Sequence, residues 1–213
     1  MNDDKWFPRF AAIPEIEYAA PKGLDFSHLA KLKITPEISY YNFDGKRRKS
    51  IMWNYGETSS SAAPAHGWTA TPRSGESEPL FILRQAYETL ELPGKLSDYH
   101  FALQRTHDEL NKFIGKEVWA AGEIEKLCKL NIQLLDKHPE TISYENENGI
   151  QYARVTAFNR LISLYENEGY LREALEVAKI AVKFDYGYEK VEEIEDKIKL
   201  LESEDSYDKP ADL

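Results

Sequence analysis

Residues Val155 to Tyr188 read VTAFNRLISLYENEGYLREALEVAKIAVKFDYGY, and this stretch decides the fold. Its apolar residues recur at spacings of three and four, which places them on one face of a helix. The first stripe consists of Ala157, Phe158, Leu161, Leu164 and Tyr165, and the second of Leu171, Ala174, Leu175, Ala178, Ala181 and Val182. A polar break from Glu166 to Gly169 separates the stripes. The stretch therefore predicts two antiparallel helices joined by a turn, with neighbouring helices covering them.

This helix pair resembles a tetratricopeptide repeat. The matching residues are Phe158, Leu161 and Tyr165 in the first helix, Gly169 in the turn, and Ala174 and Ala181 where the helices cross. Small residues at a crossing let two helix axes approach closely. Ile162 and Tyr186 depart from the family pattern, which has a small residue and a proline at these positions. The resemblance implies a helical scaffold that binds other proteins.

Residues Asp108–Thr141 offer a weaker second copy. Its matches are Gly115, Gly122 and Pro139, and its mismatches are Leu127 and Leu134. Two interpretations stay open. Either the chain turns at Gly122 and residues 140–154 form an inserted loop, or one longer helix runs through Gly122, since a single helical glycine costs only ~1 kcal/mol.

The N-terminal part differs in character. Aromatic-rich runs flank Asp44-Gly45 within Glu37–Tyr55, which predicts a β-hairpin with a two-residue turn. Residues 56–79 lack periodicity and are rich in Ser, Thr, Ala, Gly and Pro, so they predict a loop. We expect Trp68 to anchor this loop on the body or on a partner, because a tryptophan is uncommon in a disordered loop.

Further helical segments follow the loop. They are expected at Leu80–Leu92, from a cap at Ser97 to Phe113, and along a terminal stripe of Val191, Ile194, Ile198 and Leu201, with a short helical candidate earlier at Phe26–Leu32. Three parts are therefore predicted: an extension over residues 1–78, a helical-repeat-like domain over 79–203 and a disordered tail over 204–213. The fold class is mostly α, with about six helices in tetratricopeptide-like hairpins, a small β-hairpin and an extended loop.

Charge and composition limit the function. The chain of 213 residues has a net charge of −10, all of it in residues 79–213, where 17 basic face 27 acidic side chains. This excess disfavours nucleic acid and suits a basic partner. No apolar run approaches the ~18 residues of a membrane span, and the N-terminus has no secretory pattern, so we expect a cytoplasmic protein without membrane contact. The single cysteine, Cys128, cannot form an intramolecular disulfide and is expected to be buried.

Signs of catalytic chemistry are few. His100 and His107 share a helical face but stand ~10.5 Å apart along it, which is too far for one metal ion. Nucleotide-binding loops, zinc motifs and nucleophile elbows are missing from the sequence. We take His66 as a free surface histidine and His138 as a helix end. We therefore expect no metal, no cofactor and no enzyme, with a hydrolase or metal-dependent enzyme near His100 and His107 as one alternative.

Two surfaces are candidates for binding. By the tetratricopeptide resemblance, a protein-binding groove would contain Thr156, Asn159, Ser163, Glu166 and Asn167, with Lys112, Lys116 and Trp119 from the weaker copy. The alternative is nucleic-acid binding through Lys46, Arg47, Arg48, Lys49, Trp53 and Tyr55 of the β-hairpin. Cations beside stacking aromatics favour single strands, whereas lysines on a solubilised strand edge explain the same residues without a ligand. The first hypothesis is a non-enzymatic scaffold for another protein or peptide.

Overall fold

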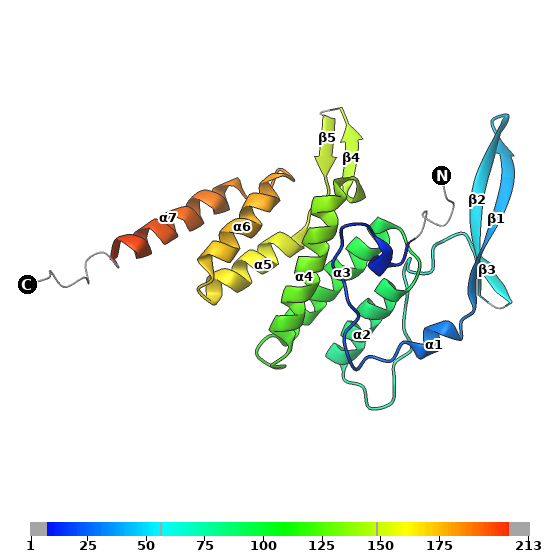
Figure 1. Ribbon diagram of the computed structural model, residues 1–213, viewed down its shortest axis with the longest axis horizontal. Coiled ribbons are helices and arrows are strands. Elements are labelled where there is room, and N and C mark those ends of the chain that lie inside the picture. Colours follow the sequence, from blue (N-terminus) through cyan, green and yellow to red (C-terminus); the bar gives the residue numbers. More distant parts are fainter. Residues whose placement is uncertain (1–7, 56, 148, 205–213) are drawn as a thin grey trace, which may run out of the picture.

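Helices make up most of the protein and follow one another in chain order (Figure 1). The computed structural model describes residues 8–55, 57–147 and 149–204. The helices are α1 (Ser27–Ala30), α2 (Glu78–Glu91), α3 (Leu96–Leu110), α4 (Ala120–Lys137), α5 (Thr156–Asn167), α6 (Leu171–Val182) and α7 (Tyr188–Glu204). The strands are β1 (Ile34–Phe43), β2 (Lys46–Tyr55), β3 (Thr58–Ser60), β4 (Ser143–Asn146) and β5 (Gly149–Tyr152). Short 3-10 helices span Phe10–Ala12, Asn111–Phe113 and Pro139–Thr141.

The predicted helix pair at Val155–Tyr188 is confirmed as α5 and α6. The connection between them contains Gly169, whose φ of 80° is a left-handed conformation that glycine adopts without steric cost. Ala174 and Ala181 of α6 are completely buried. Their small side chains let α6 pack closely on its neighbours, as the sequence pattern indicated.

The terminal helix α7 packs against α6 at the end of the row (Figure 1). Ile194 is fully buried there, whereas Leu201 of the same predicted stripe is mostly exposed. The apolar seam of α7 therefore ends before the helix does. Of the tail predicted to be disordered, Glu204 is the last residue of α7, and residues 205–213 lie outside the described part.

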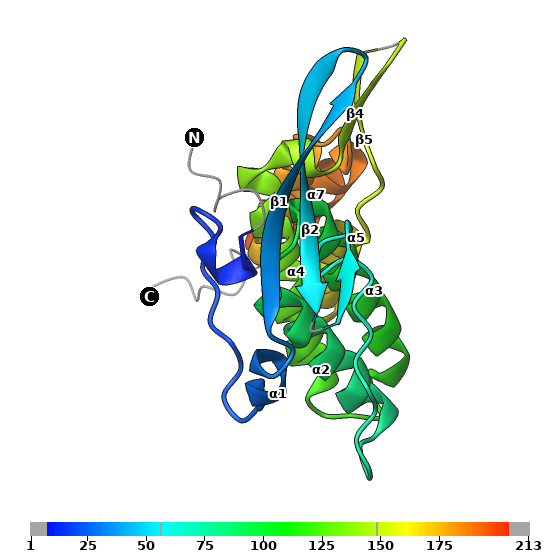
Figure 2. The ribbon, with the colours of Figure 1, turned by 90° about the vertical axis from the view of Figure 1, so that its right-hand side faces the viewer.

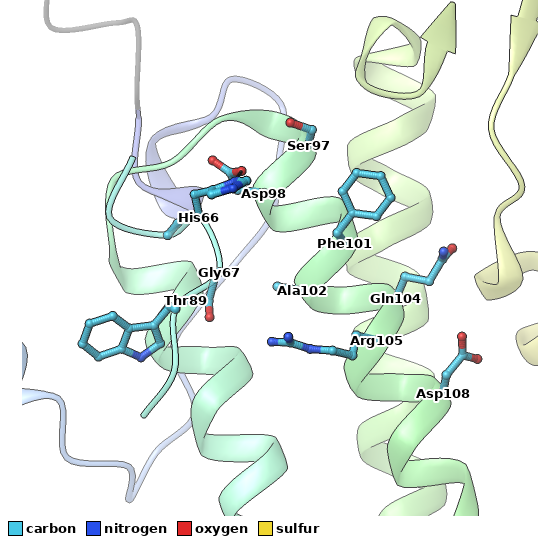
Figure 3. Close-up of a pocket in the computed structure, with 12 residues that line it drawn as sticks. His66, Gly67, Thr89, Ser97, Asp98, Phe101, Ala102, Gln104, Arg105 and Asp108 are labelled. Atoms are coloured by element: carbon cyan, nitrogen blue, oxygen red, sulfur yellow. Dashed lines mark hydrogen bonds and ion pairs between the residues drawn. The ribbon is translucent and has the colours of Figure 1, made fainter. Parts of the chain in front are cut away.

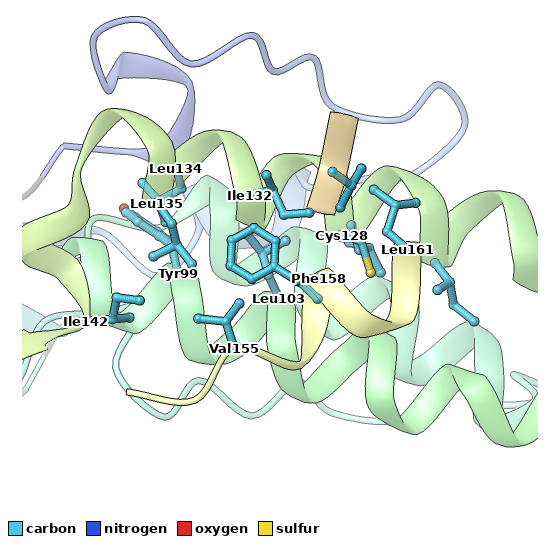
Figure 4. Close-up of a cluster of buried hydrophobic side chains, with 14 of the residues drawn as sticks. Tyr99, Leu103, Cys128, Ile132, Leu134, Leu135, Ile142, Val155, Phe158 and Leu161 are labelled. Carbon is cyan, nitrogen blue, oxygen red and sulfur yellow. The ribbon is translucent and has the colours of Figure 1, made fainter. Parts of the chain in front are cut away.

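The core lies where α3, α4 and α5 meet (Figure 4). Leu103 of α3, Cys128 of α4 and Phe158 of α5 are all fully buried within it. Burial in this apolar cluster raises the pKa of the Cys128 thiol well above its ordinary value. Cys128 is therefore a packing residue, as predicted.

The segment from Asp108 to Thr141 is not divided at Gly122. Helix α4 begins at Ala120 and runs through Gly122, so the interpretation as one longer helix holds and the turn there is wrong. Gly122 lies in the first turn of α4, where backbone N–H groups have no partner within the helix. The free-energy cost of a glycine at this position is therefore small. The chain reverses earlier, in the α3–α4 connection, where Gly115 has a φ of 80°.

Two further details differ from the sequence prediction. Residues 140–154 hold an antiparallel hairpin of β4 and β5, where an inserted loop was expected. The N-cap position of α3 is Lys95 instead of Ser97, and the carboxylate of Asp98, in the first helical turn, accepts a hydrogen bond from the Lys95 N–H at 2.8 Å. A carboxylate in the first turn also interacts favourably with the helix dipole.

The predicted β-hairpin is confirmed as β1 and β2. Asp44 and Gly45 form its turn with φ angles of 52° and 69°, the pair of positive values that a primed two-residue turn requires. The register places Tyr40 opposite Lys49, and a short third strand, β3, pairs with the other side of β2. Figures 1 and 2 show the far end of the hairpin extending away from the helices.

The loop predicted over residues 56–79 is shorter than expected, because β3 lies at its start and α2 begins at Glu78. Its remaining residues 61–77, called the strap below, pack on α2 and α3. Ala63, Ala65 and Ala70 are buried, and the Ala65 N–H donates to the Pro93 carbonyl at 3.0 Å. The predicted anchor, Trp68, is half-buried against the core and donates its indole N–H to Glu88 at 3.0 Å. Small residues allow this close packing without any periodic pattern.

A buried ion cluster holds the strap on α2. Arg84, only 3% exposed, binds Glu88 at 2.5 Å and Glu76 of the strap at 2.6 Å. Its guanidinium also donates to the Thr71 carbonyl, and it lowers the pKa of Glu76 to about 2. Glu88 is fully buried and lies 3.0 Å from His28 of α1. The cluster thus joins α1, the strap and α2.

Replacing Arg84 by methionine should destabilise the protein by about 3–5 kcal/mol, because Glu88 would be left buried without its main cation. Urea unfolding followed by circular dichroism measures this change. The control is Arg172→Met, which breaks a solvent-exposed ion pair with Glu202. We expect a change of about 0.5 kcal/mol or less there. Equal losses in the two variants would contradict the role of the buried cluster.

Candidate functional site

Helix α5 carries most of the predicted protein-binding groove, and three of these residues already have partners within the chain. Thr156 donates its hydroxyl to Asp108 at 2.9 Å, and Asn159 donates its amide to the Tyr186 hydroxyl. Glu166 accepts from Lys197 at 2.6 Å and also pairs with Lys190, both on α7. These side chains therefore tie α5 to α3 and to the C-terminal segment.

The remaining groove residues are more accessible. Ser163 and Asn167 are exposed on α5, whereas Lys112 and Lys116 are exposed on the α3–α4 connection. Trp119 is half-buried and donates its indole N–H to Glu117 at 3.2 Å.

A cleft of about 410 Å³ lies between the strap and α3 (Figure 3). Its walls include Ala65, His66, Gly67 and Trp68 of the strap, Thr89 of α2, and Ser97, Asp98, Phe101, Ala102, Gln104, Arg105 and Asp108 of α3. The strap forms one wall because several contacts hold it in place: the buried ion cluster, the hydrogen bond from the Ala65 N–H to Pro93, and His66 beside Asp98. The cleft is therefore a product of tertiary packing.

His66 is not the free surface histidine that the sequence suggested. Its Nδ1 lies 2.8 Å from the Asp98 carboxylate, although the ring itself stays largely exposed. Ser97 also lines the cleft, but within the described part of the chain no hydrogen bond joins its hydroxyl to His66. A serine nucleophile needs that contact to be activated, so the pair does not form a Ser–His–Asp triad.

Two residues of the cleft were missed at the sequence level. Phe101 is one of the apolar residues of α3, but its side chain is 57% exposed on the cleft wall. Arg105 follows one turn later and points toward the strap (Figure 3). The helical spacing of α3 does indicate that Phe101 points away from the buried face. Leu103 and Leu110 lie seven residues apart and share the buried face, whereas Phe101 precedes Leu103 by two and must point elsewhere.

The β1–β2 hairpin offers a second surface, in which cations lie over aromatic rings. The Arg47 guanidinium is 4.2 Å from the Tyr40 ring centre, and that of Arg48 is 5.1 Å from the Phe43 ring centre. All four side chains are exposed. These are cross-strand diagonal contacts of an antiparallel ladder.

The base of the hairpin is less accessible than its far end. Trp53, one of the predicted nucleic-acid contacts, is buried at 5% exposure and is not presented to a base. Tyr55 and Lys49 are half-buried, whereas Lys46 is exposed. Cations and aromatic rings are therefore accessible together only near the turn.

His100 and His107 are both fully buried on α3. The Nδ1 of His100 lies 2.8 Å from the Asn131 side-chain oxygen of α4, and burial lowers the pKa of His100. Burial also lowers the pKa of His107 to about 4, although Asp108 opposes the shift. The described residues contain no group of three His, Cys, Asp or Glu side chains placed to hold a metal ion. His138 closes α4, as predicted, and lies 3.3 Å from Glu140.

No protein-family model, curated protein or solved structure matches this chain. Within residues 8–55, 57–147 and 149–204, no helix combines the length and the apolar character needed to cross a membrane.

The buried histidines should make stability fall with acidification. The unfolded state binds a proton at each histidine below its ordinary pKa of 6.5, whereas folded His107 binds one only near pH 4. Stability from this residue is therefore complete above pH 6.5 and is lost as the pH falls toward 4. The total loss is on the order of 3 kcal/mol.

Urea unfolding of the protein and of His107→Gln between pH 7 and pH 4.5 measures this contribution. The variant should lose less stability over that interval than the unaltered protein. Carboxylates also titrate between pH 7 and pH 4.5, but both proteins contain the same carboxylates. Their contribution to the change in unfolding free energy therefore cancels when the two proteins are compared. Parallel pH profiles would contradict the assignment.

Proposed function

We propose that this chain is a non-enzymatic binding protein in which the helices form a rigid scaffold and the β1–β2 hairpin contacts another protein. The observation that carries the proposal is the exposure of large side chains on the hairpin. Ile38, Tyr40, Tyr41 and Phe43 are between 41% and 56% exposed. Ile38 and Tyr40 lie on one face of β1 and Tyr41 and Phe43 on the other, and neighbouring exposed apolar side chains are typical of interaction sites. A two-stranded ribbon clear of the body also gains little stability from burying its own surface.

The edge of the sheet supports the same proposal. Strand order is β1-β2-β3, so among the residues that the structure describes no strand pairs with the outer edge of β1. Its Pro36 and Glu37, which would hinder an added strand, lie near the base, whereas the ten-residue strand continues to Phe43. An extended segment of a partner could pair with this edge and place side chains against the exposed rings.

The helical part supports the scaffold role. The tetratricopeptide resemblance of α5 and α6 suggests that this end of the protein stacks helix hairpins, with α7 covering the last of them. Ser163 and Asn167 are the residues of the predicted α5 groove that stay exposed. We keep this groove as a secondary contact surface for a partner held by the hairpin.

Replacing exposed aromatic residues of the β1–β2 hairpin by serine should prevent binding of a protein partner. We expect Tyr40→Ser with Phe43→Ser to abolish capture of partners from the native host, measured by affinity capture and mass spectrometry. The melting temperature should change little because both side chains are exposed. The matched control is Tyr144→Ser with Ile150→Ser on the β4–β5 hairpin, whose side chains are equally exposed. If the two double variants retain the same proteins, the hairpin is not the contact surface.

Nucleic-acid binding by the same hairpin is the second candidate. The stacked pairs Arg47–Tyr40 and Arg48–Phe43 favour it, since a flat base could add to either ring. The buried Trp53 and the acidic helical part count against it. Both histidines of the enzyme alternative, His100 and His107, are buried, so we do not propose that function.

If nucleic acid binds, Arg47→Gln with Arg48→Gln should weaken affinity for single-stranded RNA or DNA and flatten its dependence on salt. Each lost phosphate contact lowers the logarithmic salt slope by ~0.7 for single strands. Fluorescence anisotropy at several salt concentrations measures both quantities. Arg154→Gln with Arg172→Gln is the matched control, because these arginines are exposed outside the hairpin. Absence of binding at low salt would eliminate this candidate.

A further inference from the structure

We infer that the cleft between the strap and α3 binds a small ligand that carries one carboxylate next to a flat apolar group. This site lies apart from the hairpin and goes beyond the proposed function. The cleft contains a cation, Arg105, on its α3 wall. Among the described residues, no hydrogen bond or ion pair engages the Arg105 guanidinium, which points toward the strap (Figure 3).

The two carboxylates that line the cleft, Asp98 and Asp108, already have partners within the chain. Asp98 accepts from the Lys95 N–H and lies against His66, both at 2.8 Å. Asp108 accepts from Thr156 at 2.9 Å and from Arg160 at 3.1 Å. The cleft therefore presents an exposed guanidinium, while both carboxylates that line the cleft already have partners within the chain. A guanidinium binds a planar carboxylate through two parallel hydrogen bonds.

The apolar wall of the cleft, beside Arg105, favours a ligand whose carboxylate is attached to a flat apolar group. Phe101 is four residues before Arg105, so the two side chains are neighbours on one face of α3. The Phe101 ring is 57% exposed, and Ala102 and Trp68 continue this wall. A flat group attached to the carboxylate could pack on Phe101 while its anion reaches Arg105. Burying such a ring gains free energy in proportion to the apolar area removed from water.

The volume of the cleft and the charges that line it limit the class of ligand further. A volume of about 410 Å³ is near the lower end of small-molecule sites and suits an aromatic acid better than a folded partner. Asp98 and Asp108 also line the cleft, and their negative charges oppose a ligand with two charges. A monoanionic carboxylate is therefore favoured over a phosphate monoester.

Titration of the full chain with phenylacetate, followed by proton–nitrogen NMR spectra, tests the inference. Shifts should concentrate on the amides of residues 65–68 and 101–108. Arg105→Gln should weaken binding about tenfold or more, as the loss of a charged hydrogen-bonded contact implies. Arg105→Lys should bind with intermediate affinity because it keeps the charge without the planar fork. Arg172→Gln, outside the cleft, should bind like the unaltered protein.

Two further probes separate the parts of the inference. The neutral 2-phenylethanol should bind more weakly than phenylacetate, because it cannot pair with Arg105. Phenyl phosphate should also bind more weakly, because of the two aspartates. Shifts outside the cleft, unchanged affinity in Arg105→Gln, or tighter binding of either probe would overturn the proposal. Since none of these measurements involves the hairpin, their outcome is independent of the proposed function.

Discussion

The buried ion pair between Arg84 and Glu88 is the contact on which the N-terminal part of the structure depends. Both residues belong to α2, one helical turn apart, and each reaches outward to a different segment. Arg84 binds Glu76 of the strap, while Glu88 binds Trp68 of the strap and His28 of α1. Charged groups can be buried only when they are paired, so these segments must pack together or not at all. The cluster therefore connects irregular segments that lack an apolar stripe of their own.

This constraint also positions both candidate surfaces. The β1–β2 hairpin lies in the chain between His28 and Trp68, so the ion cluster anchors the segments on either side of it. The same anchoring holds His66 over α3 and closes one wall of the cleft. The hairpin can thus project its far end into solvent while its base stays attached. Rigid helices behind an exposed hairpin are a suitable arrangement for binding, because less conformational entropy is lost when a partner docks.

Local patterns predicted the regular elements well. The spacing of Ala157, Phe158 and Leu161 predicted α5, and Asp44-Gly45 predicted the hairpin turn, because helix and turn geometry depend on near neighbours. The β4–β5 hairpin was missed because its strands are only four residues long and mostly exposed. The sequence left a turn and a continuing helix open at Gly122, because glycine is tolerated inside a helix as well as in a turn, and the structure shows the helix.

The sequence by itself determined the mostly helical class, the positions of the long helices and the charge asymmetry between the two halves, since all of these follow from composition and short-range periodicity. Only the tertiary structure decided where the strap lies, and therefore that Arg105 and Phe101 face a cleft. It also decided that Trp53 is buried and that Thr156 and Glu166 are engaged within the chain. The physical reason is that these properties depend on contacts between segments distant in sequence, and single-sequence patterns carry little information about such contacts.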